Sequence, residues 1–104
     1  LAANLSYGQR KLLEIGRALA TDSDVYLLDE PFAGLFPQMV EIVSKIINEL
    51  KDEGKTVILI EHNMSLIRKL SDYVLVMDSG KLLAEGKPDE VLARKDVIEA
   101  YLGE

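Results

Sequence analysis

Short runs of aliphatic residues alternate along the chain with longer segments in which apolar residues recur every three or four positions. The short runs predict strands at 25–28, 56–60 and 73–77, because continuous apolar stretches of this length are typical of strands buried on both faces. The longer pattern predicts helices, most clearly from Pro37 to Glu53, with Gly54 as a natural C-cap. Strands that alternate with helices indicate a parallel α/β sheet.

Turn and capping residues predict the remaining elements. Ser6 and Gln9 have the spacing of a capping box, which predicts a helix that runs to about Ala20. The other expected elements are a helix over 65–70, a hairpin that turns at Ser79-Gly80 into a strand over 81–85, a helix after Pro88 and a helix opened by a second capping box over 96–99. The predicted fold class is α/β, with a mostly parallel sheet, flanking helices and a C-terminal β-hairpin.

Composition narrows the classes of function. A chain of 104 residues with 48% hydrophobic content can form a packed core, and its longest apolar runs are too short to span a bilayer. The absence of cysteine excludes disulfides and thiolate metal sites. A net charge of −6 argues against broad contact with nucleic acid or an anionic membrane. The chain starts at Leu1 rather than methionine, and we interpret it as a piece of a longer protein.

Two adjacent carboxylates, Asp29 and Glu30, follow the first predicted strand. Ligands of open parallel sheets gather beyond the carboxyl ends of the strands, so chemistry is expected at this point. Asp29 could hold Mg²⁺ through its waters, and Glu30 could polarise a water for attack on a phosphoryl group. The structural alternative is that two acids merely end a strand and cap the next turn.

Two further features have both a functional and a structural interpretation. The helix that starts after Ser6 offers free N–H groups and a positive dipole end to an anion, although such a segment alone is more often only a helix cap. His62 follows the strand at 56–60, where a single histidine is more often an ordinary loop residue. The order of these features along the chain favours the functional interpretation.

Together they resemble the ATP-binding-cassette (ABC) ATPases, which are P-loop NTPases. The segment LSYGQ at 5–9 resembles the family's signature motif, VYLLDE at 25–30 resembles the Walker B strand with its catalytic glutamate, and His62 matches the switch histidine. PFAGL at 31–35 is similar to the segment leading into the D-loop. Phe36 departs from the pattern, because many members have Asp or Asn there, and this puts the polar contact of the D-loop across the dimer in doubt.

The end of the chain resembles a narrower group. The segments IEHNM, AEGKPDEV and VIEAYLGE are similar to the cytoplasmic ATPase subunits of branched-chain amino acid importers. ATPases of lipopolysaccharide exporters share a similar tail, so export of that cargo is an alternative. The resemblance covers the whole chain, 1–104, as the C-terminal portion of a nucleotide-binding domain from the signature motif onward.

The resemblance implies that ATP is hydrolysed at the interface of two ATPase subunits. Ser6, Gly8 and Gln9 would bind the γ-phosphate of ATP held by the opposite subunit. Asp29 would organise Mg²⁺, Glu30 would activate the attacking water, and His62 would contact the γ-phosphate. Transmembrane permease subunits are the other implied partners, and the implied location is cytoplasmic, at the inner face of the cell membrane.

The phosphate-binding Walker A loop, GxxxxGK[ST], does not occur in the printed sequence. Gly54-Lys55-Thr56 is a decoy, because it follows a helix and leads into a strand, the reverse of the required order. In the resembled family the Walker A strand lies between the strands at 56–60 and 73–77, so we expect these two strands to have unpaired inner edges and the chain to self-associate or to be poorly stable.

The 104-residue chain by itself is therefore predicted to be inactive. An association module without catalysis is the alternative function for this polypeptide. A nucleic-acid-linked ATPase of the same superfamily is a third hypothesis, which the acidic composition and the lack of a coiled-coil insertion disfavour.

Overall fold

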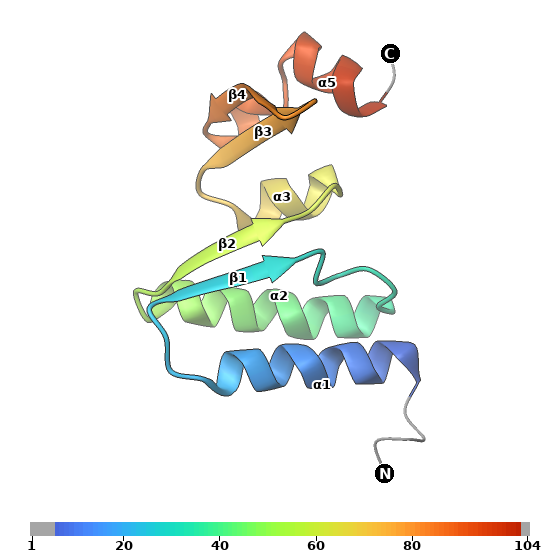
Figure 1. The fold of residues 1–104 in the computed structure, drawn as a ribbon, viewed down its shortest axis with the longest axis vertical. Helices are drawn as coiled ribbons and strands as arrows, with labels where there is room; N and C mark the ends of the chain where they lie inside the picture. The colour runs from blue at the N-terminus through green and yellow to red at the C-terminus, as the bar shows by residue number, and fades with distance from the viewer. Residues whose placement is uncertain (1–5, 103–104) are drawn as a thin grey trace. The chain divides into compact units, whose positions relative to one another are not determined.

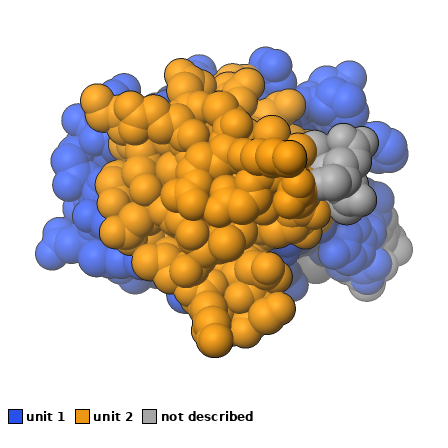
Figure 2. Space-filling model, turned by 90° about the horizontal axis from the view of Figure 1, so that it is seen from above, with its two compact units in different colours: residues 1–61 blue, residues 62–104 orange. Residues whose placement is uncertain are grey.

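The computed structural model describes residues 6–102 and divides into two compact units, residues 1–61 and residues 62–104 (Figure 2). Leu5 of the signature segment and the last two residues of the C-terminal tail lie outside the described residues.

Unit 1 contains two helices and a pair of parallel strands (Figure 1). Its elements are α1 (Tyr7–Ala20), β1 (Val25–Asp29), α2 (Pro37–Asp52) and β2 (Thr56–Ile60). The strands pair in register from Val25 opposite Thr56 to Asp29 opposite Ile60, which confirms the parallel α/β arrangement predicted for this part of the chain. Both strands therefore end at the same edge of the sheet.

Local sequence explains where the two helices of unit 1 begin and end. The Ser6 hydroxyl accepts from the Gln9 N–H at 3.2 Å and the Gln9 side chain accepts from the Ser6 N–H at 3.0 Å, which confirms the capping box. Pro37 occupies the start of α2. Gly54, with φ +83°, follows the helix, and the next N–H, of Lys55, donates to Leu50 O at 3.0 Å.

The β1–β2 sheet is covered on one face only, which corrects the prediction of strands buried on both faces. α2 packs along one face with α1 beside it (Figure 1). Side chains alternate along β1, so Tyr26 and Leu28 are buried whereas Val25 and Leu27 are 55% and 65% exposed. Ile58 and Ile60 of β2 are exposed in the same way. Both described helices of unit 1 lie on the buried side, so within residues 6–61 no helix covers the other face.

Unit 2 is built around an antiparallel hairpin. Its elements are α3 (Met64–Leu70), β3 (Val74–Asp78), β4 (Lys81–Gly86), α4 (Pro88–Val91) and α5 (Lys95–Leu102). Ser79 and Gly80 both have positive φ, +49° and +77°, as a two-residue turn of type I′ requires. The predicted hairpin is thereby confirmed. The buried core of the unit consists of Ile67, Leu70, Val74, Val76, Ala84, Val91, Leu92 and Val97.

One expectation for unit 2 is wrong. α5 begins at Lys95, one residue before Asp96, so Asp96 lies in the first turn instead of capping the helix. Its carboxylate instead accepts from Arg94 at 2.7 and 3.0 Å, and this bond is the main reason why the pKa of Asp96 is lowered. β3 pairs with the antiparallel β4, as the predicted hairpin requires.

The strand order bears on the expected gap in the sheet. Among the described residues, β2 has only β1 as a hydrogen-bonded neighbour, and β3 has only β4. The structure thus confirms that the strands at 56–60 and 74–78 do not pair with each other. Self-association through their free edges remains a prediction.

Candidate active site

The main chain of Glu30 makes a sharp turn directly after β1. Its φ is +50°, a left-handed conformation that is uncommon for any residue except glycine. Its N–H donates to Ile60 O at 2.8 Å, and its carbonyl accepts from the Lys11 ammonium at 2.6 Å and from the Ala33 N–H at 3.3 Å. Three hydrogen bonds therefore hold this turn at the carboxyl end of the strand.

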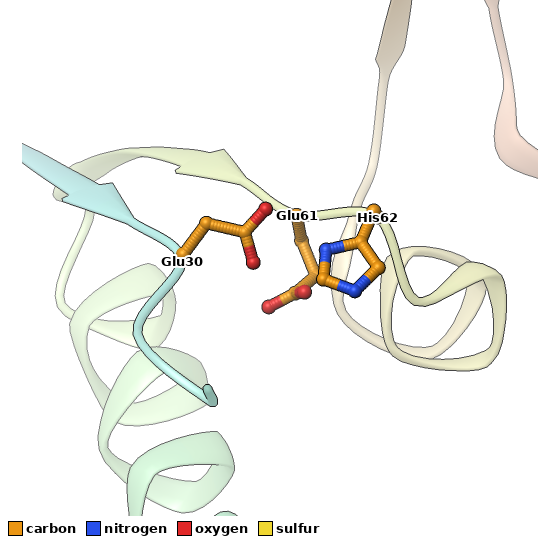
Figure 3. A group of neighbouring side chains, drawn as sticks. All are labelled: Glu30, Glu61 and His62. Carbon is orange, nitrogen blue, oxygen red and sulfur yellow. The ribbon is translucent and has the colours of Figure 1, made fainter. Parts of the chain in front are cut away.

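The turn brings two glutamates together. Carboxylate oxygens of Glu30 and Glu61 lie within 4.8 Å of each other, because β1 and β2 end side by side (Figure 3). Asp29, the last residue of β1, is exposed, and its carboxylate is not part of this group. Carboxylates grouped at this edge suit a divalent cation and its waters, and one of them could also take a proton from a water.

His62 lies next to Glu61 along the chain and is the first residue of unit 2. Figure 3 shows it with Glu30 and Glu61. Asn63 follows as the N-cap of α3, with its side chain accepting from the N–H groups of Ser65 and Leu66 at 3.0 and 3.2 Å. This cap starts a helix immediately after His62 and so fixes the path of the chain beyond the histidine.

The predicted phosphate-binding residues occupy the start of α1. Ser6 and Gln9 are exposed, and their side chains are engaged in the capping box. Gly8 is buried, and a Cβ at this position would lie 3.0 Å from the Met39 sulfur and 3.5 Å from Gly34 O. Gly8 therefore allows α1 to pack closely, a reason for glycine at this position that the sequence argument did not contain.

Tyr7 packs against the turn that follows Glu30. A Cβ on Gly34 would lie only 2.4 Å from the Tyr7 ring, so the ring rests directly on the Gly34 backbone. Gly34 also has φ +77°. This packing was not predictable from the sequence, because a tyrosine at the start of a helix gives no sign of its partner.

The structure agrees with the interpretation of Gly54-Lys55-Thr56 as a decoy. These residues connect α2 to β2, and the Lys55 ammonium lies 3.2 Å from an Asp22 oxygen and 3.9 Å from an Asp24 oxygen. The hydrogen bond with Asp22 is the main cause that raises the pKa of Lys55. Lys55 thus pairs with the carboxylates of the loop that precedes β1, away from the carboxyl ends of the strands.

Lys11 and Glu61 are site residues that sequence reasoning missed. Glu61 had a visible signal, because it is an acid that directly follows the strand predicted at 56–60, as Asp29 follows the strand predicted at 25–28. Lys11 had none, since a lysine in the second turn of an amphipathic helix is usually solvated. Only the folded chain shows that its ammonium reaches the Glu30 carbonyl.

Within residues 6–102, no helix combines the length and the apolar character that crossing a membrane requires. Two family models match the chain: residues 1–33 match the model described as ABC transporter, and residues 81–104 match the model described as branched-chain amino acid ATP-binding cassette transporter.

Curated relatives match over nearly the whole chain. The high-affinity branched-chain amino acid transport ATP-binding protein LivG of Salmonella typhimurium is 43% identical over 99% of this chain and 41% of its own length. BraF of Pseudomonas aeruginosa, which has the same descriptive name, shows the same identity and coverage. The chain thus spans about two fifths of the length of these relatives.

Solved structures share the fold. A nucleotide-free ATP-binding cassette from an ABC transporter has a TM-score of 0.83 and 38% identity, and it covers 97% of this chain and 42% of its own. The protein cbiO1 from Clostridium perfringens, described as part of the ABC transporter complex cbiONQ, has a TM-score of 0.74 and 37% identity over 94% of this chain and 39% of its own.

Proposed function

This chain belongs to the ATP-binding-cassette family, and we propose that it forms the C-terminal portion of the nucleotide-binding domain in the ATPase subunit of a membrane transporter. The observation that carries the proposal is the left-handed turn at Glu30, which sets a carboxylate beside Glu61 where two parallel strands end. This is the edge at which ligands of open α/β sheets bind.

Each residue of the site has a role in the proposal. Glu30 polarises the water that attacks the γ-phosphate, and Asp29 holds the waters of Mg²⁺. His62 contacts the γ-phosphate and keeps the water in line. The residues at the start of α1, namely Ser6, Gly8 and Gln9, bind the γ-phosphate of ATP on the opposite subunit, where helix N–H groups favour an anion.

The donor set fits the proposed cofactors, ATP and Mg²⁺. Mg²⁺ prefers oxygen ligands and keeps several of its waters, so the carboxylates of Asp29, Glu30 and Glu61 are of the right kind. When bound, Mg²⁺ neutralises charge on the phosphates of ATP. The Walker A lysine and loop would come from a part of the domain that the printed sequence does not contain.

The proposed partners are a second ATPase subunit and the permease subunits of the transporter. A dimer is needed because the signature residues bind nucleotide on the opposite subunit. Such a complex places the ATPase in the cytoplasm, peripherally on the inner face of the membrane. Nucleic acid is not among the proposed partners, given the net charge of −6.

The proposed cargo is branched-chain amino acids, taken up by the cell. Its support is the C-terminal match at 81–104 together with the relatives described above. We expect cells that carry the complete subunit and its permease to take up radiolabelled leucine, and a Glu30→Gln variant to abolish this uptake. Uptake that is unchanged by deletion of the subunit would contradict the cargo, and export of lipopolysaccharide would then be tested next.

The isolated 104-residue chain is predicted to show no MgATP hydrolysis. No group in the printed sequence replaces the lysine and backbone cradle that hold the β- and γ-phosphates. Release of phosphate from ATP by the purified chain, measured against the Glu30→Gln chain as a blank, checks this. Activity above that blank would show that the site works without a Walker A loop.

A further inference from the structure

Lys11 connects the helix of the signature motif to the main chain of Glu30. Its ammonium donates to the Glu30 carbonyl at 2.6 Å from a half-buried position on α1. A hydrogen bond from a charged donor is stronger than one between neutral groups, and partial burial reduces competition from water. Its acceptor is the peptide oxygen, so Lys11 acts on the backbone of Glu30.

The conformation of Glu30 explains why this bond matters. A left-handed backbone costs a residue with a side chain about 1–2 kcal/mol, so the turn persists only while its surroundings hold it. The carbonyl that accepts from Lys11 and the carboxylate of the site both belong to Glu30. Rotation of this peptide toward an extended conformation would redirect the side chain away from Glu61.

A second contact, between Tyr7 and Gly34, joins α1 to the same turn. Tyr7 and Lys11 are four residues apart, so they lie on the same face of the helix, one turn from each other. Tyr7 packs on Gly34 and Lys11 binds Glu30, so the two side chains hold both ends of the segment from Glu30 to Gly34. Both contacts join α1 directly to the segment that contains Glu30.

We infer that Lys11 is a positioning residue that keeps the Glu30 carboxylate aimed for hydrolysis and couples it to the position of the signature helix. The inference rests on the proposed function, in which α1 binds ATP of the opposite subunit and Glu30 acts on ATP of its own. Lys11 touches neither nucleotide. It contributes through the Glu30 main chain.

The first test uses amide hydrogen exchange in the 104-residue chain and needs no nucleotide. Lys11→Met should accelerate exchange of the Glu30 and Ala33 N–H groups, which close the turn, and should leave Ile47 inside α2 unchanged. Lys45→Met, which removes an equal charge from the exposed side of α2, is the matched control and should change neither. Unchanged exchange at Glu30 in the Lys11→Met chain would overturn the inference.

The second test measures steady-state hydrolysis by the complete subunit. Lys11→Met should lower kcat roughly 10- to 100-fold while KM for ATP stays within about twofold, because the Glu30 carboxylate loses its orientation whereas ATP binding is kept. Lys11→Arg should recover most of the rate, since it keeps a charged donor, and Lys45→Met should keep the full rate. A normal kcat in Lys11→Met, or a loss that Lys11→Arg does not repair, would contradict a positioning role.

The two tests separate this inference from the function on which it depends. If the unmodified complete subunit does not hydrolyse ATP, the proposed function fails. The exchange measurement still decides whether Lys11 holds the Glu30 turn.

Discussion

Glu30→Gln in the complete ATPase subunit is expected to slow ATP turnover by at least about 100-fold while leaving ATP binding intact. The substitution keeps the size and main-chain contacts of the residue, so the turn held by Ile60 and Lys11 should persist. It removes the carboxylate that takes a proton from the attacking water. Nucleotide should therefore remain bound, and a dimer that contains unhydrolysed ATP should accumulate.

Single-turnover hydrolysis and nucleotide binding, measured on the same preparation, check this expectation. Glu41→Gln on the exposed face of α2 is the matched control, because it makes the same chemical change away from the site. If the Glu30→Gln subunit hydrolyses ATP at the normal rate, another residue is the general base. Glu61 would be examined first, since its carboxylate lies within 4.8 Å of that of Glu30.

Gly34→Ala is expected to lower the free energy of unfolding of the chain by about 2–5 kcal/mol. A left-handed backbone with a Cβ costs about 1–2 kcal/mol, and the added methyl group would meet the Tyr7 ring at 2.4 Å, with a further cost of about 1–3 kcal/mol for overpacking. Urea denaturation followed by circular dichroism measures the loss.

Gly54→Ala separates the two contributions. Gly54 has a similar φ of +83°, but a Cβ there meets nothing within 4 Å, so only the backbone cost of about 1–2 kcal/mol is expected. Measured relative to the Tyr7→Ala chain, the loss caused by Gly34→Ala should be close to that of Gly54→Ala. Equal losses in the two single alanine variants would show that Tyr7 does not pack on the turn in solution.

Elements with local signals were predictable from the sequence. The capping box at Ser6, the end of helix α2 before Gly54 and the hairpin turn at Ser79-Gly80 are each set by residues only a few positions apart, and all three are found in the structure. The parallel pairing of β1 with β2 followed from their alternation with helices. Family membership followed from the order of motifs along the chain.

Features set by distant partners were not predictable. An aliphatic run indicates a strand, but whether Val25 and Leu27 are covered depends on how many helices pack on the sheet. The bond from Lys11 to Glu30 joins residues nineteen positions apart, and the packing of Tyr7 on Gly34 depends on where α1 lies. The roles assigned to Glu30, His62 and the signature residues remain predictions until variants are measured.

The uncovered face of the β1–β2 sheet has a consequence for how the chain behaves in solution. Val25, Leu27, Ile58 and Ile60 present an aliphatic surface that attracts a second molecule at short range, whereas a net charge of −6 repels it at longer range. Salt screens charge beyond about 10 Å at 0.1 M but leaves apolar attraction in place. Added sodium chloride should therefore promote clustering of this chain, the opposite of its effect on an assembly held by ion pairs.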